Sequence, residues 1–432
     1  MAREVEHAAD YAAMEHAADD CANIQPTRRS PLARRILTAV VACAAITLSL
    51  FISSSSSFTT ELLVQPWTSL RKGAAIPHTG SWCLGAGAKM YTKTTLKRIA
   101  DRAIYGMLTY ASTVGESKFE ASDVTRVGET FYVVCDSSWS ILKLDERLPM
   151  LSSANKLVDL VPSDVFTPPD EEDSGFEAIM HDASSGAAND FYLVRESIEH
   201  EKAAGGTAFE AEILKAHFGD DGSRQYTVEE VCHSEFRFEG DSKGFEGAVS
   251  LRGADGVLYI LGLCEGNFCS EARGKEVGNG RVVVMKRADD ESAPGGCVWK
   301  TVTTLELPKS VQFVDYSAIA VHHSTSAVAV TSQENSQLWV GELSGGYDGA
   351  FDPASAAFSE GTIYDFPRSS VGCEVQYCNI EGVHWVSGGK VDDGSTGAPQ
   401  TLVAVSDKMK SKGRQPATCQ EKDQSVHLFQ LP

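Results

Sequence analysis

The sequence is poor in positive charge. It has 38 lysines and arginines against 59 aspartates and glutamates, which gives the 432-residue chain a formal net charge of −21. A field of this sign repels phosphate backbones and attracts cations. We therefore expect no nucleic acid among the partners of this protein, and calcium or another cation becomes a candidate ligand.

Several catalytic signatures are also missing. The chain has no Gly-x-Ser-x-Gly elbow, no His-Glu-x-x-His motif, no Walker loop and no dinucleotide fingerprint after a predicted strand. It has no Cys-x-x-Cys pair with zinc spacing and no Asn-x-Ser/Thr acceptor for glycosylation. These absences disfavour enzymes that depend on those motifs. Metal-assisted hydrolysis stays open, because acids and a metal-bound water suffice for it.

One uncharged apolar run begins at Ile36 and ends at Ile52, which is just long enough to cross a bilayer. Arginines crowd its N-terminal side and no basic residue follows before Arg71, so the positive-inside tendency places the N-terminus in the cytoplasm. A cleaved signal peptide is the competing interpretation. We prefer the interpretation in which the chain has a cytoplasmic tail (1–35), a transmembrane signal anchor (36–52), a flexible stalk (53–81) and a folded domain (82–432).

This organisation predicts a single-pass type II membrane protein whose folded domain lies on the extracellular or endomembrane-lumenal side. Nine cysteines follow the anchor, and disulfides are expected in such an oxidising compartment. Cys264 with Cys269 and Cys373 with Cys378 could each close a short loop, and Cys83 with Cys419 could join the first segment to the last. Spacing leaves the connectivity open, and an odd number leaves at least one thiol outside an intramolecular pair.

A short phrase recurs five times along the folded domain. Each copy opens with a large apolar residue, and a second run rich in β-branched and aromatic residues follows and ends in an acid. The copies are 55 to 71 residues apart, the length of one four-stranded blade with its loops. The first runs open at Phe119, Phe176, Phe245, Tyr316 and Ile380, and the second runs end at Asp136, Glu196, Glu265, Glu334 and Asp407.

The repeats predict an all-β fold, a five-bladed β-propeller, with six blades as the alternative if residues 82–118 form a blade of their own. Residues 93–110 could form either a helix or the outer strand that closes the ring. The five large apolar residues that open the copies are expected to pack the blades together.

The repeats also place oxygen ligands at equivalent positions, where the inner strand of each blade begins. Carboxylates that converge on a narrow axis repel one another unless a cation neutralises them. Hard oxygen ligands favour Ca²⁺ over zinc or iron. Because the next strand is antiparallel, its terminal acid should return to the same rim. The predicted calcium ligands are Ser122, Glu177, Glu246, Ser317 and Glu381.

This series of serines and glutamates resembles the ring that holds the central calcium in the five-bladed calcium-activated nucleotidases, the soluble apyrases. The stretch Ala121-Ser122-Asp123-Val124, followed by FYVVCD, is similar to their first blade. The phrases KGFEGAVSLRGADGVLYILG and NIEGVHWV resemble the extracytoplasmic propellers grouped as phytase-like esterase domains and SdiA-regulated proteins. The resemblance covers roughly residues 118–432.

Two departures from the apyrase pattern bear on activity. Ser137 and Ser138 stand where the family has an arginine after the first rim acid, and the Cys264–Gly266 region replaces a paired arginine. Arg195 is the one rim arginine that the repeat register suggests. Phosphate transfer needs cationic groups to stabilise the transition state, so these departures disfavour a phosphohydrolase.

Two functions remain in view. The first is a binding or scaffold module with an axial calcium, whose partner is an unknown protein or a small phosphorylated ligand. The second is a calcium-dependent phosphohydrolase, apyrase-like or phytase-like, with Asp136, Glu196 and Glu265 as catalytic residues around a metal-bound water.

Overall fold

The computed structural model describes residues 94–432 apart from 110–117, 170–172, 183–188, 202–206, 220–222, 241–242, 266–268, 270–276, 371–372, 387–400 and 409–414. The predicted tail, anchor and stalk lie outside the described residues. Among the residues that are described, no helix is long and apolar enough to cross a membrane.

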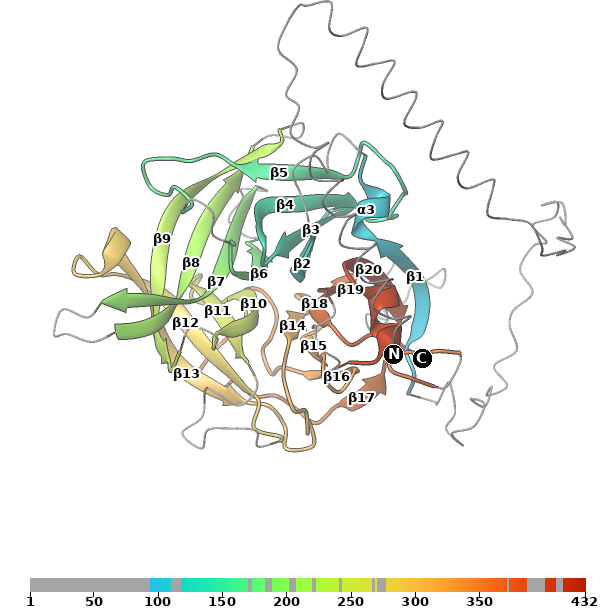
Figure 1. Cartoon of the computed structure of the whole chain (residues 1–432). Helices are drawn as coiled ribbons and strands as arrows, with labels where there is room; N and C mark the ends of the chain where they lie inside the picture. The colour runs from blue at the N-terminus through green and yellow to red at the C-terminus, as the bar shows by residue number, and fades with distance from the viewer. Residues whose placement is uncertain are drawn as a thin grey trace, which may run out of the picture. The chain divides into compact units, whose positions relative to one another are not determined.

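The described strands form five sets of four in which neighbours pair antiparallel, and short parallel pairings join the first three sets into one 12-stranded sheet (Figure 1). The first set contains β2 (Ala121–Val127), β3 (Thr130–Cys135), β4 (Ser138–Asp145) and β5 (Lys156–Leu160). The second contains β6 (Phe176–His181), β7 (Asp190–Glu201), β8 (Thr207–Phe218) and β9 (Gln225–Phe238). The third contains β10 (Phe245–Arg252), β11 (Leu258–Cys264), β12 (Arg281–Asp289) and β13 (Cys297–Glu306).

The fourth set contains β14 (Ala318–Val321), β15 (Ala327–Ser332), β16 (Gln337–Glu342) and β17 (Thr362–Asp365). The fifth combines both ends of the described chain: β18 (Ile380–Val386), β19 (Thr401–Ser406), β20 (Ser425–Gln430) and β1 (Lys97–Ala103). Three short helical turns complete the described elements: α3 (Ile104–Met107), η2 (Pro294–Gly296) and η3 (Ala417–Lys422).

Residues 93–110, which the sequence left open between helix and strand, contain the outer strand. β1 pairs antiparallel with β20 from Lys97 opposite Gln430 to Ala103 opposite Ser425. Among the described residues 94–109, only Ile104–Met107 are helical. The first described strand therefore completes the set formed by the last three strands.

The hydrophobic core is divided among the junctions between sets. Each of the five main clusters of buried side chains in the described residues joins two neighbouring sets, and one of them joins the fifth set to the first. The residues that open the five repeated phrases are each fully buried, and each lies in or against a different junction, which confirms their predicted packing role. These residues are Phe119, Phe176, Phe245, Tyr316 and Ile380.

The first strands of the sets surround a common axis. β2 contacts β6, β6 contacts β10, β10 contacts β14, β14 contacts β18, and β18 contacts β2 (Figure 1). The fold is a β-propeller, in which the starts of the five inner strands lie near one another although they are far apart in sequence.

Three disulfides join described cysteines. Cys264 bonds to Cys269, as predicted, and Cys232 bonds to Cys297 across β9 and β13. Cys378 bonds to Cys419, so the suggested pairs Cys373–Cys378 and Cys83–Cys419 are both wrong. The physical reason is that the turn η3 places Cys419 beside the start of the fifth set, a contact that sequence spacing does not reveal.

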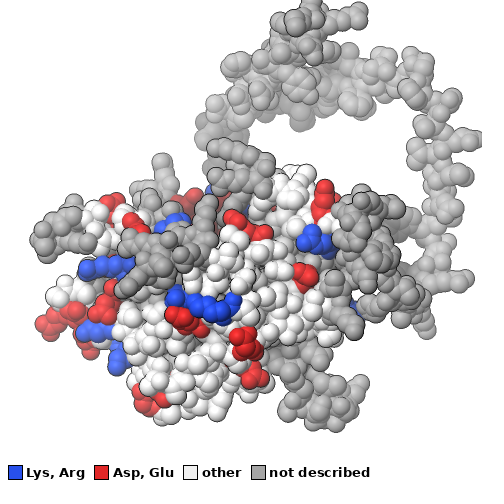
Figure 2. Space-filling view, turned by 90° about the horizontal axis from the view of Figure 1, so that it is seen from below, with Lys and Arg blue, Asp and Glu red and all other residues white. Residues whose placement is uncertain are grey.

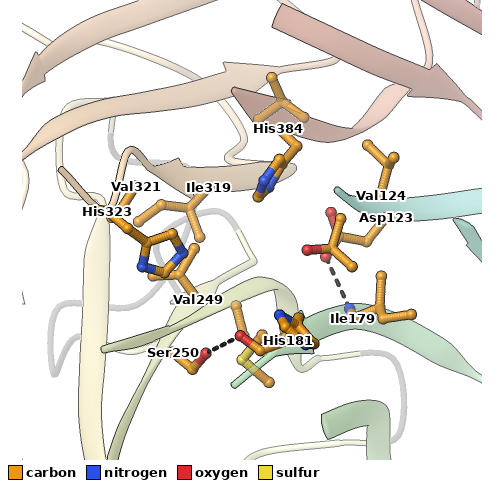
Figure 3. A pocket seen from close by; sticks show the side chains of 14 residues that line it. Asp123, Val124, Ile179, His181, Val249, Ser250, Ile319, Val321, His323 and His384 are labelled. Atoms are coloured by element: carbon orange, nitrogen blue, oxygen red, sulfur yellow. Dashed lines mark hydrogen bonds between the residues drawn. The ribbon is translucent and has the colours of Figure 1, made fainter. Parts of the chain in front are cut away.

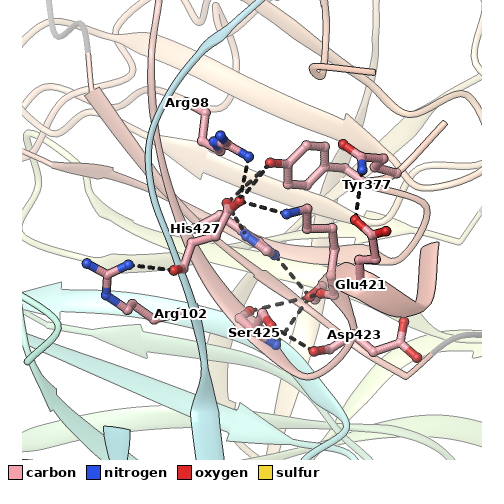
Figure 4. A network of polar contacts seen from close by, with 11 residues as sticks. Arg98, Arg102, Tyr377, Glu421, Asp423, Ser425 and His427 are labelled. Carbon is pink, nitrogen blue, oxygen red and sulfur yellow. Dashed lines mark hydrogen bonds and ion pairs between the residues drawn. The ribbon is translucent and has the colours of Figure 1, made fainter. Parts of the chain in front are cut away.

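A half-buried carboxylate fixes β1 to the rest of the fifth set (Figure 4). Asp101 accepts hydrogen bonds from Lys422 Nζ (2.9 Å) and Tyr377 Oη (3.1 Å), and its other oxygen lies 2.9 Å from His427 Nδ1. Burial alone would raise the pKa of Asp101, but the contacts with His427 and Lys422 hold it well below its usual range. Asp101 is therefore ionised and paired at neutral pH.

The network continues from His427 Nε2 to Ser406 Oγ, 3.1 Å away. This order of contacts is that of a serine hydrolase triad, but Ser406 and His427 are 1% and 0% exposed, and Ser406 Oγ donates to the Lys422 carbonyl. A buried and already bonded hydroxyl cannot reach a substrate. The network therefore stabilises the closure of the propeller.

We expect Asp101→Asn to destabilise the fold by about 3 kcal/mol, because it leaves buried partners of the carboxylate without their charge. In the wild type the stabilisation from Asp101 is fully present above the unfolded-state pKa and is lost as the pH falls below about 4. Chemical denaturation between pH 7 and pH 3 measures both effects. A variant as stable as the wild type, with the same acid sensitivity, would contradict the assignment.

Candidate functional site

Four of the five predicted calcium ligands lie at β-bulges. The pairing of the first two strands skips one residue in the first, second, third and fifth sets. A bulge leaves the extra residue unpaired and redirects its side chain. The extra residues are Ser122, Glu177, Glu246 and Glu381. In the fourth set, β14 pairs with β15 without a shift, and Ser317 directly precedes the strand.

A repeated backbone hydrogen bond places the rim acids, which are the five acids that end the second runs, beside these bulges. In four sets the backbone amide of the rim acid donates to the carbonyl two residues before the bulged residue. The four bonds are Asp136 N to Glu120 O (2.8 Å), Glu196 N to Gly175 O (2.7 Å), Glu265 N to Gly244 O (3.1 Å) and Asp407 N to Asn379 O (2.9 Å). The acids therefore return to the same rim as the strand starts, as the antiparallel pairing predicted.

The fourth set differs at this rim as well. The amide of Glu334 donates to the carboxylate of Asp315, 3.2 Å away, and Glu334 is exposed. The other four rim acids are half-buried. Four of the five sets thus share one geometry, and the fourth departs from it.

Glycines allow the inner strands to approach closely beside the predicted ligands. A Cβ on Gly247 would lie 3.1 Å from the Cα of Ala318, and a Cβ on Gly382 would lie 2.7 Å from the Cα of Asp123. These glycines follow Glu246 and Glu381, whereas Ala318 and Asp123 follow Ser317 and Ser122. The backbone contacts therefore make Glu246 a neighbour of Ser317, and Glu381 a neighbour of Ser122.

Hydrogen bonds connect two further pairs of neighbouring inner strands. Asp123 Oδ2 accepts from the amide of Ile179 (2.9 Å), which joins β2 to β6. Ser317 Oγ donates to the carbonyl of Ile380 (2.8 Å), which joins the start of β14 to β18. Ser122 Oγ accepts from the amide of Asp136 (3.1 Å). Both serine hydroxyls thus have structural hydrogen bonds, and a hydroxyl oxygen has a second lone pair with which to bind a cation.

The pKa of Glu177 reflects the carboxylates that surround it. Burial raises its pKa well above the usual value, and the charges of Glu246, Asp136, Glu381 and Glu196 raise it further. The predicted inner glutamates and two of the predicted catalytic acids therefore lie within electrostatic range of one side chain. Crowded carboxylates of this kind bind either protons or a cation.

Lysines accompany the rim acids, a feature that the repeat pattern did not reveal. Lys243 Nζ lies 3.1 Å from Glu265 Oε2, and Lys118 Nζ lies 2.5 Å from Glu120 Oε2 and 3.6 Å from Asp173 Oδ2. Burial raises the pKa of Asp136, and the charges of Glu120 and Asp173 raise it further. The rim thus combines acids with two cationic side chains.

Arg195 has a structural role. Its Nη1 lies 2.6 Å from Glu212 Oε2, its Nε donates to the carbonyl of Ser174 (2.8 Å), and its guanidinium lies over the ring of Trp139. The side chain is buried. The repeat register suggested Arg195 as a candidate for a phosphate or carboxylate contact, but β7 directs this side chain toward β8 and the core, where it pairs with Glu212, while its neighbour Glu196 faces the rim.

We expect Gly382→Ala to destabilise the protein by about 1 to 3 kcal/mol, because the new methyl group would overlap the backbone of β2. Gly240→Ala is the matched control, because a Cβ at Gly240 meets no atom within 4 Å. Thermal unfolding of both variants measures the difference. Equal stability of the two variants would show that the contact between β18 and β2 is not as close as described.

No known family model matches the chain, and no curated protein matches it in sequence. Solved structures with similar folds include the PQQ-bound aldose sugar dehydrogenase of Streptomyces coelicolor, with 12% identity, a TM-score of 0.39, and coverage of 77% of this chain and 98% of that one. A luciferin-regenerating enzyme has 9% identity, a TM-score of 0.35, and coverage of 77% and 95%. The Cps50 (Swd1) β-propeller domain has 8% identity, a TM-score of 0.29, and coverage of 72% and 84%.

Proposed function

We propose that the protein is a membrane-anchored, extracytoplasmic β-propeller of five blades that binds Ca²⁺ on its axis and acts as a binding or scaffold module. The five sets of strands are the blades, and Ser122, Glu177, Glu246, Ser317 and Glu381 supply oxygen ligands at the starts of the inner strands. Residues 36–52 anchor the propeller to the membrane, on the extracellular or lumenal side.

The observation that carries the calcium proposal is the environment of Glu177, where burial and four nearby carboxylates all disfavour its ionised form. A divalent cation removes this repulsion and gains the carboxylates as ligands. The donors are all oxygens, and Ca²⁺ accepts 6 to 8 oxygen ligands with waters completing its shell. The donor set therefore fits calcium.

Calcium on the axis would have a structural consequence. Its ligands come from all five blades, so the ion binds the closed ring and not the unfolded chain. An ion present at 100 times its dissociation constant stabilises the fold by about 2.7 kcal/mol. A propeller stabilised in this way is suited to present its loops to a partner outside the cell or in an endomembrane lumen.

Thermal unfolding of the full chain in EGTA and in millimolar Ca²⁺ tests this proposal. We expect calcium to raise the midpoint of the wild type, and Glu246→Gln to remove most of that rise because one ligand charge is lost. The same substitution should leave the calcium-free protein at least as stable, because it removes one member of a repelling group.

Glu334→Gln is the matched control, since Glu334 is an exposed rim acid outside the proposed ligand set. It should retain the full calcium-induced rise. If calcium leaves the wild-type midpoint unchanged, or raises it equally in Glu246→Gln, the axial site is refuted.

A second candidate function is a calcium-dependent phosphohydrolase that acts on nucleotides or phosphate esters. Lys118 and Lys243 favour it, because they bring positive charge to a rim that lacks the arginines of the calcium-activated nucleotidases. In this function Asp136, Glu196 and Glu265 would surround a metal-bound water. Calcium-dependent phosphate release that Glu246→Gln abolishes would support it, and the absence of release from a panel of nucleotides and phytate would leave the binding module.

A further inference from the structure

A cavity lies on the axis, and its lining residues are farther along the inner strands than the proposed calcium ligands. Residues from all five inner strands line it, including Thr125, Met180, Val249 and Val321. The residues that line it also include Val124, Ile179, Ala248, Ile319 and Val383. Asp123 at its edge directly follows the proposed calcium ligand Ser122, but each lining histidine lies three or more residues beyond the proposed ligand of its own set, and three residues of strand span about 10 Å.

Three imidazoles and one carboxyl group face this cavity (Figure 3). His181 ends β6, His384 lies on β18, and His323 follows β14. Asp123 on β2 lines the same space and is buried. The four side chains come from four different blades, so only closure of the ring brings them together.

The Nδ1 atom of His323 lies beside a carboxylate. It is 3.2 Å from Asp348 Oδ2, an ion-pair distance, and is shielded from solvent, but it makes no hydrogen bond of regular geometry. Asp348 Oδ1 accepts in turn from the backbone amide of Arg252 (3.1 Å). A histidine oriented through one nitrogen by a carboxylate is typical of metal sites, where the other nitrogen binds the ion.

The His384 imidazole is neutral at physiological pH. Burial lowers the pKa of His384 to about 3, and the nearby His323 and Arg126 lower it further. A neutral imidazole presents a lone pair to a metal at physiological pH. Nitrogen donors from three histidines suit Zn²⁺ and related ions, whereas Ca²⁺ prefers oxygen donors alone.

We propose that this cavity is a second metal site, which binds a divalent transition ion such as Zn²⁺ through His181, His323 and His384, with Asp123 beside them. Among the described residues, the set with ligating atoms all within 4.8 Å of one another is Glu230 with the disulfide-bonded Cys232 and Cys297. The histidine nitrogens are farther apart than this, so binding requires the rings to rotate toward the ion. Three protein ligands would leave a fourth position open to water or to a ligand.

Calorimetric titration of the full chain with Zn²⁺ tests the proposal. The protein should carry no polyhistidine tag, and saturating Ca²⁺ should be present to occupy the proposed calcium site. We expect one saturable site, which His384→Ala and His323→Ala each weaken by more than about 10-fold. Co²⁺ as a probe should give visible absorption bands of nitrogen coordination that the same variants lose.

His322→Ala is the matched control. His322 precedes His323, but its Nδ1 contacts the hydroxyls of Thr325 (3.0 Å) and Ser324 (3.2 Å), and it does not line the cavity. It should retain the affinity of the wild type. Asp348→Asn should weaken binding by about 10-fold and alter the Co²⁺ spectrum, because Asp348 orients His323 without touching the ion.

Two results would overturn the site: no saturable Zn²⁺ binding by the folded wild type, or binding that His384→Ala and His323→Ala leave unchanged. The His323 side chain is 37% exposed, so its variant should fold even if His384→Ala does not. Glu246→Gln separates this proposal from the calcium proposal, because it should remove most of the calcium-induced rise in the midpoint and keep the Zn²⁺ site.

Discussion

The structure depends on the close approach of the inner strands around the axis. Gly247 and Gly382 lack side chains where β10 meets β14 and where β18 meets β2, so backbone can contact backbone. The five hydrophobic clusters lie at the junctions and bring the blades together, but it is the small residues at the axis that let the ring close. The same close approach brings together carboxylates that repel one another unless protons or a cation neutralise them.

Closure also depends on a contact between the two ends of the described chain. β1 completes the fifth set, and Asp101 fixes it through His427, Lys422 and Tyr377. The fifth set contacts the first along the axis as well, through Gly382 and Asp123. The stability of the outer edge and the geometry of the axis are therefore connected through one blade.

The axis has two ends with different chemistry. Bulged glutamates gather where the inner strands start, and histidines line a cavity farther along these strands. Hard oxygen donors and imidazole donors select different cations. Acidic and basic side chains are both present on the face of the described residues shown in Figure 2, so that face is not uniformly acidic.

The sequence by itself determined the features that arise within one hairpin. Apolar runs rich in β-branched and aromatic residues indicate strands such as β3, β15 and β19, which are almost entirely buried, and antiparallel pairing returns the acids that end these runs to the edge where the inner strands begin. The phrase that opens at Phe119 and Phe176 therefore predicted the repeats, the buried residues and the shared rim.

Only the tertiary structure decided the contacts between residues far apart in sequence. It showed the partner of Cys419, the hydrogen bond between Asp123 and Ile179, and the three histidines from different blades that line one cavity. Local patterns specify a strand and its faces, but they carry no information on which strand will lie opposite. That choice follows from closing the whole ring, because each blade buries its apolar face only against its neighbours.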